Sequence, residues 1–261
     1  MPTVDRIVEW ALKNPPEKLF RYQPPKIKRV EMFLLRNKLY ATSPKWFKDP
    51  LDTVVPLDTS GKRSEWVARL DKLIDEQAPN MPKAEREQRV AMALDSGLHI
   101  KMEEESKQAL RDATGIVCLT DQEDNQFMWE NYAKKGRGFC VCFDYSQADP
   151  VLGEAIPVQY LPEHPTYRYV DVNVRDVIVE LMVTKLTKWK QEKEWRLVYL
   201  DTPDSFQGFT PTSLRAIVLG PKSSKNFVRR CKKMIKKRRY PTKIYKIIKN
   251  KNAKGTRMVL L

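Results

Sequence analysis

The stretch Trp189-Lys-Gln-Glu-Lys-Glu-Trp-Arg196, continued by Leu-Val-Tyr-Leu200, is the most informative part of the chain. Its second half, residues 195–200, is aromatic and β-branched and contains no breaker, which predicts a β-strand. Side chains two residues apart on a strand share a face and are about 7 Å apart. Glu192 and Glu194 are therefore expected to point the same way, among bulky apolar neighbours. Such a pair can hold a sugar hydroxyl or stabilise a cation, or it can simply begin a charged strand.

Strand and helix signals alternate irregularly on both sides of this stretch. The clearest buried strand is 214–220, and further strands are predicted at 18–22, 39–43, 115–120, 139–143, 155–160, 242–248 and 257–261, the last two as a hairpin around 252–255. Helices are predicted at 4–13, 26–37, 125–134, 172–188 and 223–237. Because several strands have short connections, we expect an α+β fold with a mixed, mainly antiparallel sheet rather than a doubly wound parallel sheet.

Residues 62–111 differ in character from the rest of the chain. They are rich in Glu, Lys, Arg, Ala and Met and carry no strand signal. The pattern predicts two or three helices, interrupted near 79–82 and at Ser96-Gly97. We interpret this part as a helical insertion in a single α+β domain that spans residues 1–261.

The composition is that of a globular protein, with 41% hydrophobic and 31% charged residues. No apolar run approaches the roughly 18–20 residues that span a bilayer. Asp5 and Glu9 interrupt the first ten residues, so no export signal is expected and a cytoplasmic location is inferred. The four cysteines form no Cys-x-x-C motif and the two histidines are far apart, so no metal site is expected. Cys140 and Cys142 are interpreted as buried thiols of a reducing compartment.

The net charge of +15 is placed unevenly along the chain. Residues 205–261 hold 17 Lys and Arg and no Asp or Glu, which leaves 31 basic and 33 acidic residues elsewhere. Such a cluster attracts polyanions, so we expect nucleic acid (RNA or DNA) as a partner, without base-reading elements. The alternative is a solvated helix face that only keeps the protein soluble. The expected contact residues are Arg229, Arg230, Lys232, Lys233, Lys236, Lys237, Arg238 and Arg239.

A set of short motifs, in a fixed order over nearly the whole chain, carries a family resemblance. They are Phe20-Arg-Tyr22, Leu39-Tyr-Ala-Thr-Ser-Pro44, Trp46-Phe-Lys-Asp-Pro-Leu-Asp52, Cys118-Leu-Thr120, Met128-Trp-x-x-Tyr-Ala133, Gly138-Phe-Cys-Val-Cys-Phe-Asp144, Lys185, Trp189-x-x-Glu-x-Glu-Trp-Arg196 and Ile217-Val-Leu-Gly220. In the order and spacing of these motifs, the chain resembles the bacterial domain-of-unknown-function family 2971. Lys48 departs from the family, which usually has Asn there. The family's sporadic occurrence would suit a toxin or phage-defence effector.

A looser resemblance is to ADP-ribosyltransferases, which place an Arg on a first strand, a Ser or Tyr on a second and a Glu-x-Glu on a late one. Arg21, Tyr40 with Ser43, and Glu192-x-Glu194 occur here in that order on predicted strands. The resemblance implies an ADP-ribosyltransferase-like fold, with NAD as substrate and no metal. The helical segment 62–111 would account for the long spacing to the third element.

That resemblance implies a role for each residue. Glu194 would grip the ribose and face the positive charge that develops as nicotinamide leaves, and Glu192 would orient or deprotonate an acceptor. Arg21 would bind the pyrophosphate or ribose, and Ser43 would hydrogen-bond the catalytic carboxylate. The residues expected to stack on nicotinamide are Tyr22, Tyr40 and Trp129.

Structural alternatives exist for each of these residues. The two glutamates could pair locally with Lys190, Lys193 and Arg196, and Arg21 could be bonded to Asp49 or Asp52. Trp129 could belong to the core. Two other functions also stay open: a metal-dependent nuclease that uses Asp144, Glu192 and Glu194, and a nucleic-acid-binding module without enzyme activity.

Overall fold

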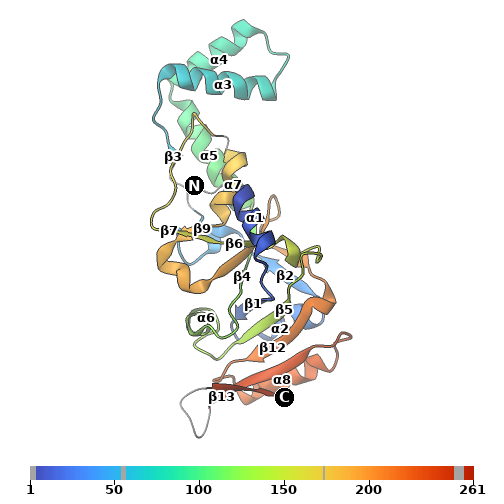
Figure 1. Cartoon of the computed structure of the whole chain (residues 1–261). Coiled ribbons are helices and arrows are strands. Elements are labelled where there is room, and N and C mark those ends of the chain that lie inside the picture. The colour runs from blue at the N-terminus through green and yellow to red at the C-terminus, as the bar shows by residue number, and fades with distance from the viewer. Residues whose placement is uncertain (1–3, 54–56, 173, 250–255) are drawn as a thin grey trace.

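A computed structural model of the protein describes residues 4–53, 57–172, 174–249 and 256–261 (Figure 1). Its central sheet has eight strands: β1 (Lys18–Gln23), β4 (Gly115–Thr120), β5 (Phe139–Asp144), β6 (Ile156–Pro157), β10 (Glu194–Tyr199), β12 (Leu214–Leu219), β13 (Lys243–Lys249) and β14 (Thr256–Leu260). Their order is β14-β13-β12-β5-β1-β4-β10-β6, and only β12 and β13 are parallel neighbours. The expected combination of helices with a mainly antiparallel sheet is therefore confirmed.

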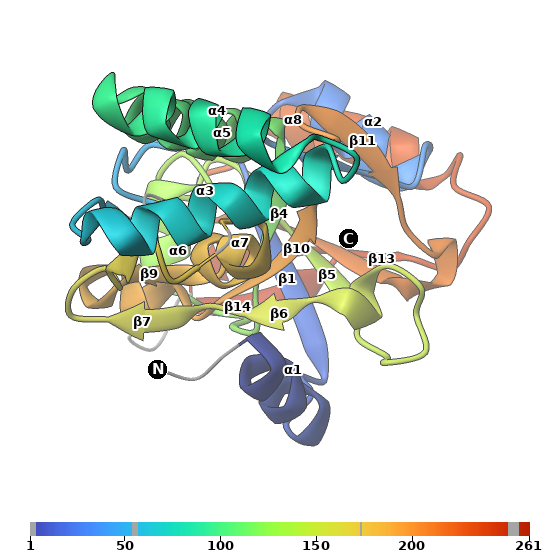
Figure 2. The same cartoon turned by 90° about the horizontal axis from the view of Figure 1, so that it is seen from above.

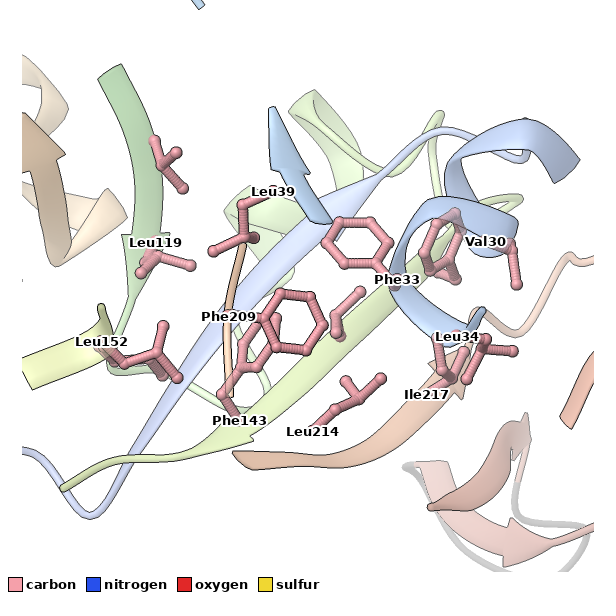
Figure 3. Close-up of a cluster of buried hydrophobic side chains, with 14 of the residues drawn as sticks. Val30, Phe33, Leu34, Leu39, Leu119, Phe143, Leu152, Phe209, Leu214 and Ile217 are labelled. Atoms are coloured by element: carbon pink, nitrogen blue, oxygen red, sulfur yellow. The ribbon is translucent and has the colours of Figure 1, made fainter. Parts of the chain in front are cut away.

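The two faces of this sheet carry separate hydrophobic clusters, because side chains alternate along each strand. On one face, α2 (Ile27–Leu34) and α8 (Lys225–Ile235) cover the central strands, and Phe33 and Leu34 lie near Phe143 and Ile217 (Figure 3). On the other face, α6 (Gln126–Asn131) packs Trp129 against the sheet. Burial of these apolar side chains on both sides makes the middle of the sheet the core of the protein.

The sheet opens between β1 and β4. These strands pair only at Phe20 and Thr120, whereas β1 and β5 pair along six residues. Farther along β4, Ile116 bridges instead to Thr42, which follows β2 (Lys38–Ala41). β2 forms a two-stranded ribbon with β11 (Ser205–Gly208). Beyond Phe20 the two central strands therefore diverge, and the candidate site lies in this opening.

Three helices follow one another where the sequence predicts them: α3 (Arg63–Gln77), α4 (Lys83–Asp95) and α5 (Leu98–Ala113). α3 and α4 run alongside each other away from the sheet, and α5 leads back to it (Figures 1 and 2). Most of their exposed cations have a carboxylate nearby, such as Lys83 with Glu87 and Arg89 with Glu85. None of the helices in the described residues is long and apolar enough to cross a membrane.

Some predicted boundaries are wrong. The helix expected at 172–188 is α7 (Val174–Met182), because the next residues leave it to form β9 (Thr184–Leu186), which pairs with β7 (Gln159–Leu161). The helix expected to reach residue 37 ends at Leu34, since Asn37 has a left-handed backbone with φ of 51°. The final hairpin is confirmed as the antiparallel pair β13 and β14, while its expected turn at 252–255 lies outside the described residues.

The remaining elements are one ten-residue helix and several short segments. They are α1 (Val4–Lys13), η1 (Pro44–Trp46), β3 (Leu57–Asp58), η2 (Leu152–Glu154), β8 (Tyr167–Arg168), η3 (Thr187–Glu192) and η4 (Pro211–Ser213). All four cysteines are free thiols, and Cys140 and Cys142 are buried in the sheet as predicted.

Candidate functional site

A cavity of about 310 Å³ lies in the opening between β1 and β4. Its walls come from β1, the loop after β2, β4, α6 and the segment from β9 to the start of β10. The lining residues are Phe20, Arg21, Tyr22, Gln23, Arg29, Thr42, Trp46, Phe47, Lys48, Asp49, Asp52, Cys118, Leu119, Met128, Asn131, Tyr132, Lys185, Trp189, Glu192 and Glu194. Aromatic rings and charged groups of both signs therefore share one cavity.

A buried cluster of ion pairs forms one wall of the cavity. The ammonium of Lys185 lies 2.5 Å from Glu192 Oε2, 3.0 Å from Glu194 Oε2 and 3.2 Å from Asp52 Oδ2. The Lys185 side chain is 6% exposed and the three carboxylates are 5% exposed or less. One cation thus stands between three carboxylates that come from distant parts of the chain.

Arg196 completes this cluster from behind the cavity. Its side chain is fully buried, and Nη2 donates to both carboxylate oxygens of Asp52 at 2.9 Å. Nε donates to Glu194 Oε1 at 2.9 Å, and Nη1 donates to the carbonyl of Met182 at 2.6 Å. All of its side-chain nitrogens are therefore used, which makes Arg196 an internal support for the carboxylates.

The convergence of Glu192 and Glu194 is confirmed, although not through strand geometry. Glu192 ends the 3₁₀ helix η3, and the strand begins only at Glu194. Lys193 between them has a left-handed backbone with φ of 46°. This turn, rather than alternation along a strand, directs both carboxylates at Lys185.

The two glutamates have opposite pKa shifts. Burial alone would raise the pKa of Glu194, but the charges of Arg196 and Lys185 outweigh it and hold the pKa well below its usual range. Burial, together with the neighbouring Glu194, raises the pKa of Glu192 despite the charge of Lys185. Glu194 is thus a permanent anion, whereas Glu192 is the member of the pair that more readily takes up a proton.

Two tyrosines and a cysteine lie against the two glutamates. The hydroxyl of Tyr132 donates to Glu192 Oε1, and burial beside that carboxylate raises the pKa of Tyr132. The backbone N–H of Glu194 donates to the hydroxyl of Tyr160 at 2.8 Å. Burial, followed by the charge of Glu194, raises the pKa of the Cys118 thiol, so this thiol stays protonated. The cluster is therefore oriented by neutral groups as well as by charges.

Arg21 lies on the opposite wall of the cavity. Its Nη2 donates to the carbonyl of Tyr40 at 3.0 Å, while the buried Nη1 has no hydrogen-bond partner among the residues that the structure describes. Burial lowers the pKa of Arg21 to about 10, so the group remains charged at neutral pH. A buried guanidinium nitrogen without an acceptor is costly, and an anionic ligand in the cavity would satisfy it.

The loop after β2 closes one side of the cavity and is fastened by its aspartates. Asp49 accepts a hydrogen bond from Trp189 Nε1 and lies 3.5 Å from the ammonium of Lys188. Lys48 donates to the carbonyl of Asn131 at 3.2 Å. The alternative that Arg21 binds Asp49 or Asp52 is therefore wrong, because both aspartates have other partners.

Three of the predicted ligand-binding residues do not line the cavity. Ser43 is fully buried and its hydroxyl donates to the carbonyl of Asp112, because the chain turns there into η1. The ring of Tyr40 lies on the outer side of β2, where it packs on Phe206 with centroids 5.0 Å apart. Trp129 belongs to the core, as the alternative reading held, and its ring meets Tyr22 edge-on at 5.0 Å. Arg21, Tyr22, Glu192 and Glu194 are brought together as predicted.

Sequence reasoning missed Lys185 and Asp52 as partners of the glutamates. Both lie in motifs of the family resemblance, but no local pattern assigns them a role. Asp52 and Arg196 are 144 positions apart, so only the fold brings them together. The alternative that the glutamates only form local ion pairs is confirmed in part, because Glu194 pairs with Arg196, but this pair and the pair of Glu194 with Lys185 are both buried.

The carboxylates expected for a nuclease are not assembled. The row of the sheet that contains Glu194 continues through Thr120 and Phe20 to Cys142, three strands away. Asp144 is two residues beyond Cys142, so it lies more than three strand spacings from Glu194, roughly 14 Å. Asp144 instead lies 3.7 Å from Arg215. In the described part of the chain, no group of three or more His, Cys, Asp or Glu is placed to hold a metal ion.

The residues predicted to contact nucleic acid lie on and after α8, and all but one are exposed. The exception is Arg238, whose guanidinium donates to the carbonyls of Leu34 and Pro211 and to Asn37 Oδ1. Its donors join α2, the loop before β12 and the end of α8. Its expected role in nucleic-acid contact is therefore wrong, since the side chain is a structural link.

Comparison with known protein families, curated proteins and solved structures finds no match to this chain. The family resemblances drawn from the sequence therefore remain expectations.

Proposed function

We propose that the protein is an NAD-dependent, ADP-ribosyltransferase-like enzyme that breaks the bond between nicotinamide and ribose in the cavity between β1 and β4. The observation that carries this proposal is the pairing, in one cavity, of a carboxylate cluster with an Arg21 nitrogen that has no acceptor among the residues the structure describes. The carboxylate cluster suits a sugar cation, and the Arg21 nitrogen suits a phosphate.

The charge balance of the cluster supports a role in stabilising a cation. Asp52, Glu192 and Glu194 supply three carboxylates against the two cations Lys185 and Arg196. With all five groups ionised, one negative charge is left over at the cavity wall. As nicotinamide leaves with the bonding electron pair, positive charge develops on the ribose, and this excess charge stabilises the transition state more than the ground state.

The opposite pKa shifts divide the work between the two glutamates. Glu194 keeps a fixed negative charge, because Arg196 and Lys185 lower its pKa. Glu192 has a raised pKa and is the better general base for the acceptor's proton. The acceptor, a group of a protein or nucleic acid or a water molecule, then forms the new bond to the ribose carbon while Glu192 takes up its proton.

The position of Arg21 supports a role in binding the phosphates of the same ligand. Phe20, Thr120 and Glu194 occupy one row of the sheet. Arg21 follows Phe20 at the point where β1 and β4 diverge, so its backbone lies at least one residue and two strand spacings from that of Glu194, roughly 10 Å or more. That separation lets one nucleotide contact both. The cavity is at the lower end of the range for small-molecule sites, so we expect it to enclose the nicotinamide half of NAD and leave adenine outside.

The test is release of nicotinamide from NAD, measured by chromatography with and without EDTA, with protein and nucleic acid as added acceptors. We expect EDTA-resistant release by the wild type, and a loss of at least about 100-fold in Glu192→Gln and Glu194→Gln. Glu130→Gln, an exposed residue of α6 that does not line the cavity, is the matched control.

Arg21→Gln keeps the test informative if a glutamate variant fails to fold, since Arg21 makes no ion pair in the cluster. Its KM for NAD should rise while the fold, followed by circular dichroism, is unchanged. Absence of release by the folded wild type, or equal rates in all variants, would refute the proposal.

A further inference from the structure

A second hollow, of about 400 Å³, lies along α8 on the far side of the sheet from the cavity wall. We call it the α8 groove, and it is lined by Lys225, Val228, Arg229, Lys232, Lys233, Lys236 and Lys246. Six of its seven lining residues are cations. Four come from α8, Lys236 directly follows the helix, and Lys246 comes from β13 on the other side of the groove.

The helix that presents these cations is firmly seated. Phe227 and Cys231 on its inner face belong to the main hydrophobic cluster. Ser224 caps its first turn by accepting from the N–H of Phe227 at 3.2 Å, and the Ser223 hydroxyl donates to the carbonyl of Gly138 at 3.1 Å. The charged face is therefore held in a fixed place by the core, as a binding surface requires.

The cations of the α8 groove have no neutralising partners within the described residues. None of its lining residues forms an ion pair there, and residues 205–261 contain no Asp or Glu. Lys225, Arg229, Lys232 and Lys236 follow one another at spacings of three or four residues, where like charges on a helix repel. An ordinary solvated helix face avoids this cost by mixing signs, as α3–α5 do with Lys72–Glu76 and Lys101–Glu105.

We propose that the α8 groove binds the phosphate backbone of duplex DNA, without reading its sequence. Lys225 and Lys236 are eleven residues apart, or roughly 16 Å along the helix, which matches about five phosphates of one strand. The groove has no aromatic side chain on which the bases of a single strand would stack. It also has no side chain that could accept a hydrogen bond from a 2′-hydroxyl, so DNA is favoured over RNA. This surface does not depend on the NAD chemistry proposed for the cavity.

The test is fluorescence anisotropy of a labelled 20-base-pair DNA duplex with the full-length protein over a series of salt concentrations. Six phosphate contacts predict a slope of log K against log salt of about −5. The variant with Lys225, Arg229, Lys232 and Lys236 all changed to Gln should bind at least about 100-fold more weakly at low salt, with a slope near −2.

The matched control removes the same number of charges from α3–α5, with Lys72, Lys83, Arg89 and Lys101 all changed to Gln. Both variants have the same net charge, so general attraction to DNA is lowered equally. We expect the control to keep its affinity within about threefold and its slope within about one unit. Circular dichroism establishes that both variants are folded.

Competition experiments decide the class of partner. Equal loss of binding in the two quadruple variants would refute the α8 groove as the site. Tighter binding of single-stranded DNA, of duplex RNA or of anionic lipid vesicles than of duplex DNA would refute the assignment to DNA. Weaker binding of all three, together with the loss in the α8 variant, is the result that the proposal predicts.

Discussion

The cavity between β1 and β4 and the α8 groove use charge in opposite ways. In the cluster at the cavity wall, Lys185 and Arg196 are buried among three carboxylates, and each of these two cations has anionic partners within about 3 Å. In the α8 groove, six cations lie together, five of them exposed and Lys246 half-buried, and none forms an ion pair within the described residues.

The difference shows what each set of charges does for the molecule. A buried ion cluster costs much desolvation free energy, so its members depend on one another and removal of one is damaging. Exposed like charges cost little individually but leave the surface without neutralisation. The first arrangement therefore belongs to the folded site itself, and the second to attraction of something outside the protein.

Removal of the central cation of the cluster is the strongest test of this contrast. Lys185→Met leaves three carboxylates with Arg196 alone, and we expect the free energy of unfolding to fall by about 3–5 kcal/mol. Lys188→Met removes a half-exposed cation three residues away and should cost less than about 1 kcal/mol. Urea denaturation measures both, and equal losses would contradict the mutual dependence of the cluster.

Replacing a glutamate of the cluster by glutamine removes its charge and keeps its shape, so the effect of the charge on stability can be measured alone. The lowered pKa of Glu194 contributes stability above about pH 4.5, and this contribution is lost as the pH falls. Glu194→Gln should therefore destabilise by about 3 kcal/mol at pH 7, and the loss should shrink gradually as the pH falls below about 4.5.

Glu192 should behave in the opposite way. Its raised pKa means that ionisation of this carboxyl costs stability as the pH rises. Glu192→Gln should therefore leave the free energy of unfolding at pH 7 within about 1 kcal/mol of the wild type, or above it. Urea denaturation at pH 7 and pH 3 checks both variants, and a larger loss for Glu192→Gln than for Glu194→Gln at pH 7 would reverse the assignment of their roles.

The smallest expected effect concerns the α8 groove. Changing Lys225, Arg229, Lys232 and Lys236 to Gln removes repulsion between like charges, so the protein should become more stable by up to about 1 kcal/mol at low salt. The gain should vanish at 0.5 M salt, roughly, where charges are screened within about 5 Å. Thermal unfolding at the two salt concentrations measures it. A loss of stability that salt does not change would instead indicate that these cations support the fold.

The parts of the fold that the sequence predicts are those with strong local signals. The strands at 115–120, 139–144 and 214–219 were expected within one residue, because their apolar runs are bounded by turns. The end of α7 was missed because pairing of Thr184–Leu186 with β7 overrides the local helical pattern. The short ribbon strand Ser205–Gly208 carries too little pattern to be recognised.

The sequence predicts only those residues of the candidate site whose positions follow from the order of the strands along the chain. Arg21, Tyr22, Glu192 and Glu194 meet in one cavity, as strand order suggested. The direction of the Ser43 hydroxyl depends on the carbonyl of Asp112, which no local pattern reveals.

Binding of NAD measured by isothermal titration calorimetry, with the wild type and Arg21→Gln side by side, tests the proposed site most directly. We predict saturable binding to the wild type and a dissociation constant at least about tenfold higher for Arg21→Gln, because that substitution removes a charge-assisted hydrogen bond to phosphate. Equal affinities, or no binding to the folded wild type at millimolar NAD, would contradict the site.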